Sequence, residues 1–185
     1  PWLDRRLPIS WISRFLEPIA AQRWSQTHRA HLLVGPRQAG KSSLIWRYLA
    51  DRGEPVLFVD CEQPLVRQWC ASAPLLLADI AQLVPPSTPL FFEEVQHLAE
   101  AGLFLKGLVD RRVDAPILVT GSSSYHLLSG TRESLAGRAS RLRLLPLSAA
   151  EVCADLADQP PLVRRARTEE RLARHLAIGG YPAVW

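Results

Sequence analysis

The chain has 185 residues, a formal net charge of +4, 48% hydrophobic residues and 22% charged residues. This composition is typical of one globular domain, or of one domain with a small appendage, and it excludes a disordered or fibrous chain. No apolar stretch approaches the roughly 20 residues of a membrane span, and residues 1–10 lack the layout of a signal peptide. The sequence therefore predicts a cytoplasmic protein with no membrane partner. Its three cysteines show no CxxC spacing and indicate neither a zinc site nor a disulfide framework.

The N-terminal segment, residues 1–29, is predicted to be helical and to pack on the core. Its helical periodicity runs over residues 11–24, with apolar side chains at Trp11, Ile12, Phe15 and Ile19. Two interpretations stay open. The helix either borders a ligand pocket built by later parts of the chain, or it is an ordinary core helix.

The segment GPRQAGKS, residues 35–42, matches GxxxxGK[ST] at every fixed position. An apolar run over 30–34 precedes it and a segment with helical periodicity over 42–49 follows it, which is the strand–loop–helix context that this motif requires. Gly35 and Gly40 are expected to adopt backbone dihedrals that other residues resist, so that successive N–H groups can curl round a phosphate. The dipole of the following helix would point its positive end at the same anion.

We therefore expect this loop to bind the phosphates of a nucleoside triphosphate. Lys41 would reach the β- and γ-phosphates, and the Ser42 hydroxyl would ligate Mg²⁺. The predicted nucleotide-binding residues are Gly35, Pro36, Arg37, Gln38, Ala39, Gly40, Lys41, Ser42 and Ser43.

The apolar run over 90–92 ends in two carboxylates, Glu93 and Glu94. An unpaired carboxylate is costly to bury, so this pair is either solvated at a strand end or placed against a positive charge. At a triphosphate site Glu93 would hold Mg²⁺ through water, and Glu94 would polarise the attacking water. At such a site the first of the two acidic residues is usually Asp. The extra methylene of Glu93 shifts its carboxylate by more than about an ångström relative to Asp, which favours slow turnover.

Five short apolar strands and three further helices are predicted from periodicity. The strands are 31–34, 55–60, 90–93, 116–120 and 141–145, and the helices are 65–83, 98–113 and 168–178. This alternation predicts an α/β fold in which a parallel sheet has helices on both faces and binds its ligand at the carboxyl ends of the strands.

Two further segments have alternative interpretations. The serine-rich run that follows the fourth strand makes the Ser122 hydroxyl a candidate sensor of the γ-phosphate, although such a run is also a common helix cap. Beyond a predicted linker at 158–161, five arginines lie at helical spacing among Glu169 and Glu170. They indicate an ion-paired, solvated helix face or, as a weaker alternative, a DNA-binding surface.

Taken together, these motifs resemble the AAA-type ATPases of bacteria and archaea, in the additional-strand P-loop class. The similarity is closest to a widespread prokaryotic family that often carries a C-terminal domain of uncharacterised function. It rests on GPRQAGKSSL, FFEEVQHL, LVTGSSS, LAGRASRLRLLPLSAAEV and GGYP, which together span residues 30–182. The resemblance implies a three-layer P-loop NTPase sandwich with sheet order 5-1-4-3-2. It also implies that Arg138 and Arg141 contact the γ-phosphate, in cis or across a subunit interface.

The domains expected are the N-terminal segment at 1–29 and a P-loop ATPase core at 30–147. Residues 148–185 are expected to be the start of a helical lid or of a linker to a C-terminal domain. The leading function is an ATP-binding, Mg²⁺-dependent ATPase module that couples hydrolysis to conformational change. The alternative is a nucleotide-gated scaffold or sensor that binds ATP with little hydrolysis. A small-molecule kinase would need an acceptor site, and the sequence shows no obvious group of residues for one. A GTPase would need an NKxD motif, which the sequence lacks. The expected partners are ATP and ADP, together with a protein partner or a second copy of the chain.

Overall fold

The computed structural model describes residues 11–122 and 135–185. The helices and strands of these ranges are α1 (Glu17–Trp24), β1 (Ala30–Gly35), α2 (Lys41–Arg52), β2 (Leu57–Asp60), α3 (Pro64–Trp69), α4 (Ala73–Ile80), β3 (Leu90–Glu93), η1 (Val95–His97), α5 (Ala101–Asp110), β4 (Ile117–Ser122), β5 (Ala139–Arg143), α7 (Ala149–Val152), η2 (Ala154–Leu156), α8 (Pro161–Ile178) and η3 (Pro182–Val184).

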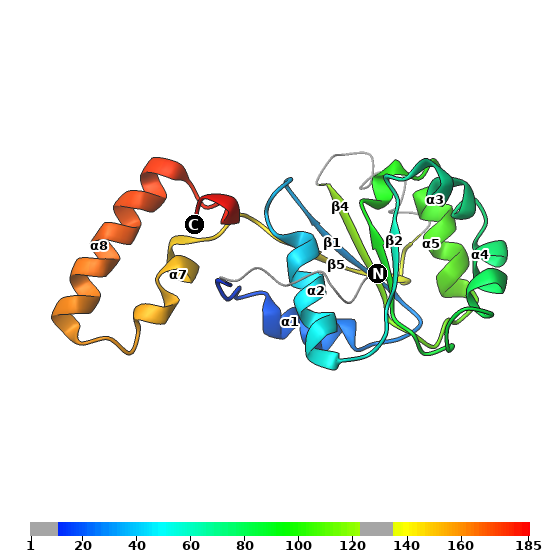
Figure 1. Ribbon diagram of the computed structural model, residues 1–185, viewed down its shortest axis with the longest axis horizontal. Helices are drawn as coiled ribbons and strands as arrows, with labels where there is room; N and C mark the ends of the chain where they lie inside the picture. Colours follow the sequence, from blue (N-terminus) through cyan, green and yellow to red (C-terminus); the bar gives the residue numbers. More distant parts are fainter. Residues whose placement is uncertain (1–10, 123–134) are drawn as a thin grey trace.

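The five strands form one parallel sheet in the order β2-β3-β4-β1-β5 (Figure 1). Read from the opposite edge this is 5-1-4-3-2, so the predicted order is confirmed. β4 lies between β1 and β3, with Ser122 opposite Gly35. Because all strands run in the same direction, the carboxyl ends of β1, β3 and β4 lie at the same edge of the sheet. This is the edge where parallel α/β proteins bind their ligands.

Helices cover both faces of the sheet and make three layers. α3, α4 and α5 pack on the face formed by Leu32, Phe92 and Val119, and α1 and α2 pack on the opposite face, with Leu33, Phe91 and Leu118. Phe91 and Phe92 are both fully buried, one on each face. A parallel strand buried on both faces has a continuous apolar sequence, which explains the run that precedes the two glutamates.

Prolines account for the main errors in the predicted helix boundaries. The helix predicted over 65–83 is two helices, α3 and α4, because Pro74 lacks an N–H and its ring would clash with a carbonyl one turn earlier. α1 begins at Glu17 and not at Trp11, since Pro18 excludes a helical turn before it. α8 begins at Pro161, seven residues before the predicted start, because proline is favoured at the first helical position.

The remaining boundaries differ by a few residues. β5 runs from Ala139 to Arg143 where 141–145 was predicted, and α5 covers Ala101–Asp110 where 98–113 was predicted. Such shifts are usual at the ends of elements.

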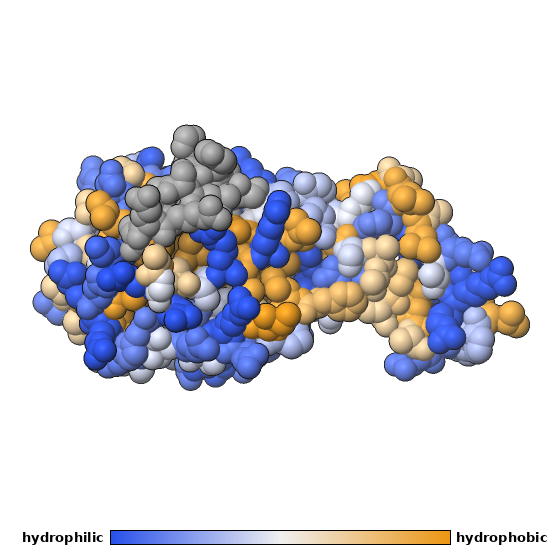
Figure 2. Space-filling view, turned by 180° about the vertical axis from the view of Figure 1, so that it is seen from behind, coloured by the Kyte–Doolittle hydropathy of each residue, from blue (hydrophilic) through white to orange (hydrophobic). Residues whose placement is uncertain are grey.

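The C-terminal hairpin, formed by α7, η2 and α8, projects away from the three layers (Figure 1). It begins with a capping box, in which Ser148 and Glu151 satisfy one another's backbone N–H groups. Figure 2 shows apolar surface on this hairpin, where Leu162, Leu176 and Ile178 are exposed. The role of residues 148–185 as the start of a lid or of a linker stays a prediction. Among the described residues, no helix combines the length and apolarity that crossing a membrane requires.

Candidate nucleotide-binding site

The loop between β1 and α2 has the kind of backbone expected of a phosphate cradle. Gln38 and Gly40 are in the left-handed region, with φ of 60° and 91°, so the expected special dihedral is present at Gly40. Gly35 needs to be glycine for a different reason from the one expected. Its φ is not positive, but a Cβ added there would lie 2.1 Å from the carbonyl oxygen of Leu144, so glycine is required by the close approach of the chain after β5.

Lys41, the first residue of α2, is 5% exposed and points back over this loop. Its Nζ donates to the carbonyl oxygens of Gly35 (3.3 Å) and Pro36 (3.0 Å), and it lies 3.9 Å from the Glu94 carboxylate. Burial lowers the pKa of Lys41, and the negative charge of Glu94 opposes that shift. The ammonium group therefore sits among oxygen acceptors at the point where a phosphate would be held.

A pocket of about 720 Å³ opens at this edge of the sheet. It is lined by Arg37, Gln38, Gly40, Lys41, Ser42, Ser43, Asp60, Glu62, Glu93, Glu94, Pro182 and Ala183. The structure thus brings most of the predicted phosphate loop together with both glutamates of β3. The Ser42 hydroxyl and the carboxylates are hard oxygen donors, the ligand type that Mg²⁺ prefers.

Asp60 is a pocket residue that the sequence analysis missed. It is the last residue of β2 and pairs in register with Glu93 of β3. The available signal was its position, since a carboxylate that ends a buried parallel strand faces the same sheet edge as the phosphate loop.

Glu94 is held in an unusual conformation directly after β3. Its φ is 53°, and its backbone N–H donates to the Thr120 Oγ1 at 3.0 Å. Its carboxylate accepts a hydrogen bond from the side-chain Nε2 of Gln96, whose Oε1 accepts the backbone N–H of Ser122 at 3.1 Å. Strained non-glycine backbone of this kind persists where surrounding contacts enforce it, and it is concentrated at functional sites. Thr120 and Gln96 were not assigned roles from the sequence.

Ser122 lies at the carboxyl end of β4, opposite Gly35 at the start of the phosphate loop. The structure therefore brings this predicted sensor residue next to the cradle and, through Gln96, next to Glu94. The two serines that follow it lie outside the described residues.

Arg138 is not brought to the pocket by its own chain. Its carbonyl accepts the N–H of Ala30, and its side chain pairs with Asp110 at 2.5 Å, so it lies at the amino end of β1 and β5. The six residues of β1, at about 3.3 Å per residue, separate this end of the sheet from the phosphate loop. Arg141 pairs with Leu32 in the middle of β1. Contact with a phosphate in cis therefore does not fit this structure, and contact across a subunit interface stays a prediction.

The GGYP segment returns the end of the chain to the pocket. The Leu147 N–H donates to the Gly180 carbonyl at 2.6 Å, and a Cβ at Gly180 would lie 2.1 Å from the Leu147 oxygen. This contact places Pro182 beside the phosphate loop, where a Cβ at Gly40 would meet its Cγ at 3.6 Å. The motif thus closes one wall of the pocket.

A buried ion pair links the phosphate loop to the C-terminal hairpin. Arg14 Nη1 donates to the Ala39 carbonyl, and Arg14 Nε donates to Glu151 Oε1, both at 3.0 Å. The Arg14 and Glu151 side chains are 5% and 8% exposed. In the segment predicted to border a ligand pocket or to be a core helix, Ala20 and Trp24 are core residues. Phe15 and Ile19, on which that prediction rested in part, are 60% and 46% exposed and do not face the core.

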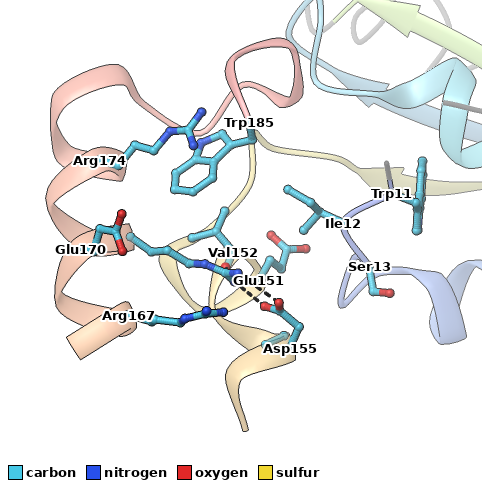
Figure 3. Close-up of a pocket in the computed structure, with 12 residues that line it drawn as sticks. Trp11, Ile12, Ser13, Glu151, Val152, Asp155, Arg167, Glu170, Arg174 and Trp185 are labelled. Carbon is cyan, nitrogen blue, oxygen red and sulfur yellow. Dashed lines mark hydrogen bonds and ion pairs between the residues drawn. The ribbon is translucent and has the colours of Figure 1, made fainter. Parts of the chain in front are cut away.

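A second cavity of about 830 Å³ lies between residues 11–13 and the C-terminal hairpin (Figure 3). Four of its charged side chains, those of Glu151, Asp155, Arg171 and Arg174, have partners within the chain. Arg171 pairs with Asp155, and Arg174 lies over the Trp185 ring, 4.9 Å from its centroid. Together with the Arg165–Glu169 pair on α8, these contacts fit the ion-paired helix face expected for this arginine cluster. DNA binding stays a prediction.

Comparison with known proteins places this site in a family. A family model described as an AAA domain matches residues 27–153. Uncharacterised proteins of Mycobacterium bovis and Mycobacterium tuberculosis are each 34% identical to the chain over 143 residues, covering 76% of this chain and 31% of the relative. The chain therefore matches less than a third of the length of these relatives.

Among solved structures, a Walker-type ATPase of Pyrococcus abyssi has a TM-score of 0.59 and 18% identity, and the match covers 93% of this chain and 65% of that one. This likeness supports the fold. The family model covers more than half of the chain, and the phosphate loop, Glu93 and Glu94 all lie within the matched residues. The chain belongs to the AAA domain family and contains its nucleotide-binding, ATPase-type module.

Proposed function

We propose that this chain is an ATP-binding, Mg²⁺-dependent ATPase module that couples nucleotide binding and hydrolysis to a conformational change. The observation that carries the proposal is the meeting of Lys41 and Glu94, 3.9 Å apart, in one pocket beside the phosphate loop. A cation for the phosphates and a carboxylate for the attacking water are the two side chains that hydrolysis of a terminal phosphate needs.

The phosphates would bind to residues 35–43. Backbone N–H groups of the loop and the positive end of the α2 dipole both attract an anion there. Lys41 would exchange its contacts with the Gly35 and Pro36 carbonyls for contacts with the β- and γ-phosphates.

The donor set also fits Mg²⁺, which would be held by Ser42 and Glu93, with Asp60 able to orient its water ligands. When bound, Mg²⁺ neutralises charge on the β- and γ-phosphate oxygens. Glu94 would accept a proton from the attacking water or orient it. Ser122 would report the state of the γ-phosphate from the end of β4, and Arg138 would act only on a neighbouring subunit.

The structure also suggests how the change could be transmitted. Among the described residues, the Arg14–Glu151 pair connects the nucleotide pocket to the C-terminal hairpin, and so does the contact of the phosphate loop with Pro182, which follows α8. A shift of the phosphate loop on ATP binding would therefore be transmitted to the hairpin through these contacts. A protein partner or a second copy of the chain would respond to that movement.

A nucleotide-gated scaffold remains the second candidate, and one observation favours it. Glu93 stands where Asp is usual, and its longer side chain would displace the metal ligands from the geometry that fast turnover needs. Such a protein would bind ATP and change shape with little hydrolysis.

The test measures ATP affinity and phosphate release on the same preparation in the presence of Mg²⁺. Lys41→Ala should lose ATP binding, and Glu94→Gln should keep binding but lose turnover. Lys106→Ala, which removes the other lysine of the chain on α5, should change neither. Binding without turnover in the wild type would establish the scaffold function, and no binding at all would refute both candidates.

A further inference from the structure

Gln96 uses both ends of its side-chain amide at the candidate catalytic centre. Its Nε2 donates to Oε2 of Glu94, and its Oε1 accepts the backbone N–H of Ser122 at 3.1 Å. A carboxylate only accepts hydrogen bonds and a backbone N–H only donates them, so the amide has one possible orientation. The side chain therefore connects the end of β4 to the carboxylate that follows β3.

The backbone around Gln96 is firmly anchored. Gln96 lies in η1 between Val95, which is fully buried, and His97, and the next residue, Leu98, is also buried in the core. The His97 N–H donates to the Glu94 carbonyl at 3.1 Å. A side chain on such a turn can hold a partner in place, because its own backbone does not move freely.

Glu94 has a different neighbour on each carboxylate oxygen. Gln96 occupies Oε2, and Oε1 is the oxygen that lies 3.9 Å from Lys41 in the pocket. Gln96 thus turns Oε1 toward the pocket, where a proton acceptor is required. The strained backbone of Glu94, with φ of 53°, is held from the other side by Thr120.

We propose that Gln96 is a positioning residue for ATP hydrolysis, one that fixes the orientation of the Glu94 carboxylate and couples it to the end of β4 at Ser122. The inference rests on the proposed ATPase function. Ser122 stands opposite Gly35 of the phosphate loop, so a change beside the terminal phosphate reaches Glu94 through a single side chain. Loss of this contact leaves the phosphate loop intact and frees Glu94 to rotate.

Two substitutions separate the contacts of Gln96. Gln96→Leu removes both hydrogen bonds at similar volume. Gln96→Glu keeps an acceptor for the Ser122 N–H but replaces the donor to Glu94 with a second carboxylate. If Gln96 positions Glu94, both variants lose turnover. If it only supports Ser122, Gln96→Glu retains turnover.

The experiment measures ATP affinity, kcat for phosphate release and thermal stability for the wild type, both Gln96 variants and Glu94→Gln. Misplacing a catalytic group by about 1 Å costs about 100-fold in rate, so we expect both Gln96 variants to lose about 10- to 100-fold in kcat. Their ATP affinity should stay within about threefold of the wild type, since Gln96 is not among the residues that line the pocket. The matched control is Gln82→Leu, an exposed glutamine after α4, which should change none of these quantities.

Each outcome has a distinct meaning. Wild-type kcat in Gln96→Leu or Gln96→Glu overturns the inference and leaves the ATPase proposal standing. A wild type that releases no phosphate, or releases it as fast as Glu94→Gln does, overturns both. If Gln96→Leu fails to fold, Gln96→Glu decides the question, because glutamate has nearly the same size and shape as glutamine and replaces only the amide NH₂ group with an oxygen.

Discussion

Replacement of Arg14 by alanine should destabilise the chain more than the loss of any exposed ion pair. Arg14 and Glu151 are 5% and 8% exposed, and the guanidinium also donates to the carbonyls of Ala39 (3.0 Å) and Leu145 (2.5 Å). Removing one partner of a buried pair costs about 3–5 kcal/mol, because the other charge stays buried. At about 2–4 °C per kcal/mol for a chain of this size, the expected decrease in Tm is about 6–20 °C.

The measurement is urea or thermal unfolding of Arg14→Ala beside a matched control. Arg165→Ala breaks an i,i+4 pair with Glu169 whose side chains are 81% and 67% exposed, so it should cost less than about 0.5 kcal/mol. If the two arginine variants lose equal and small amounts of stability, the reasoning is wrong, since burial would then not govern the strength of the pair.

The pH dependence gives an independent check on the same pair. Burial raises the pKa of Glu151, but the N–H groups of Ser148 and Phe15 and the Arg14 guanidinium together lower it below its ordinary value of 4.5. A carboxyl group with a lowered pKa contributes stability that is complete above 4.5 and is lost as the pH falls through the folded-state value. The difference in unfolding free energy between wild type and Arg14→Ala should therefore shrink as the pH is lowered below 4.5.

Two further predictions concern the pocket wall and the sheet. Gly180→Ala places a Cβ 2.1 Å from the Leu147 oxygen, so we expect it to displace Pro182 and weaken ATP binding measured by titration; at Gly53, where a Cβ meets nothing within 4 Å, alanine should leave ATP affinity unchanged. His31 is fully buried, and burial lowers its pKa from 6.5, so thermal stability should decline as the pH falls below 6.5. His31→Phe should flatten that decline in melts at pH 5 to 7.

The sequence predicted those features that local chemistry dictates. The phosphate loop could be placed because anion binding fixes the glycine and lysine spacing of the motif that it matches, and Phe91 and Phe92 marked a strand because burial on both faces requires an unbroken apolar run. The strand order came from resemblance to known proteins, since alternation alone predicts a parallel sheet but not which strands are neighbours. Helix ends were least accurate at Pro18, Pro74 and Pro161, where the position of proline relative to the first turn decides whether it starts or breaks a helix.

The features that the sequence could not predict depend on tertiary contacts. Arg14 lies 137 positions from Glu151, and Gln96 lies 26 positions from Ser122. No period or spacing connects residues so far apart. The reason for Gly35 was also misjudged, because the carbonyl that excludes a Cβ comes from Leu144, which follows β5 and is distant in sequence.

The contacts of Lys41 imply that ATP binding is an exchange of partners. Its ammonium group has three N–H donors; it donates to the carbonyls of Gly35 and Pro36, and the Glu94 carboxylate lies 3.9 Å away as its ion-pair partner. On the proposed function, a phosphate that approaches Lys41 would compete with these contacts. If the phosphate displaced the Glu94 carboxylate from Lys41, that carboxylate would keep its hydrogen bond from Gln96, and its Oε1 would be available for water. On the proposed function, the terminal phosphate would thus compete with Glu94 for Lys41, and Glu94 would become available to water when ATP binds.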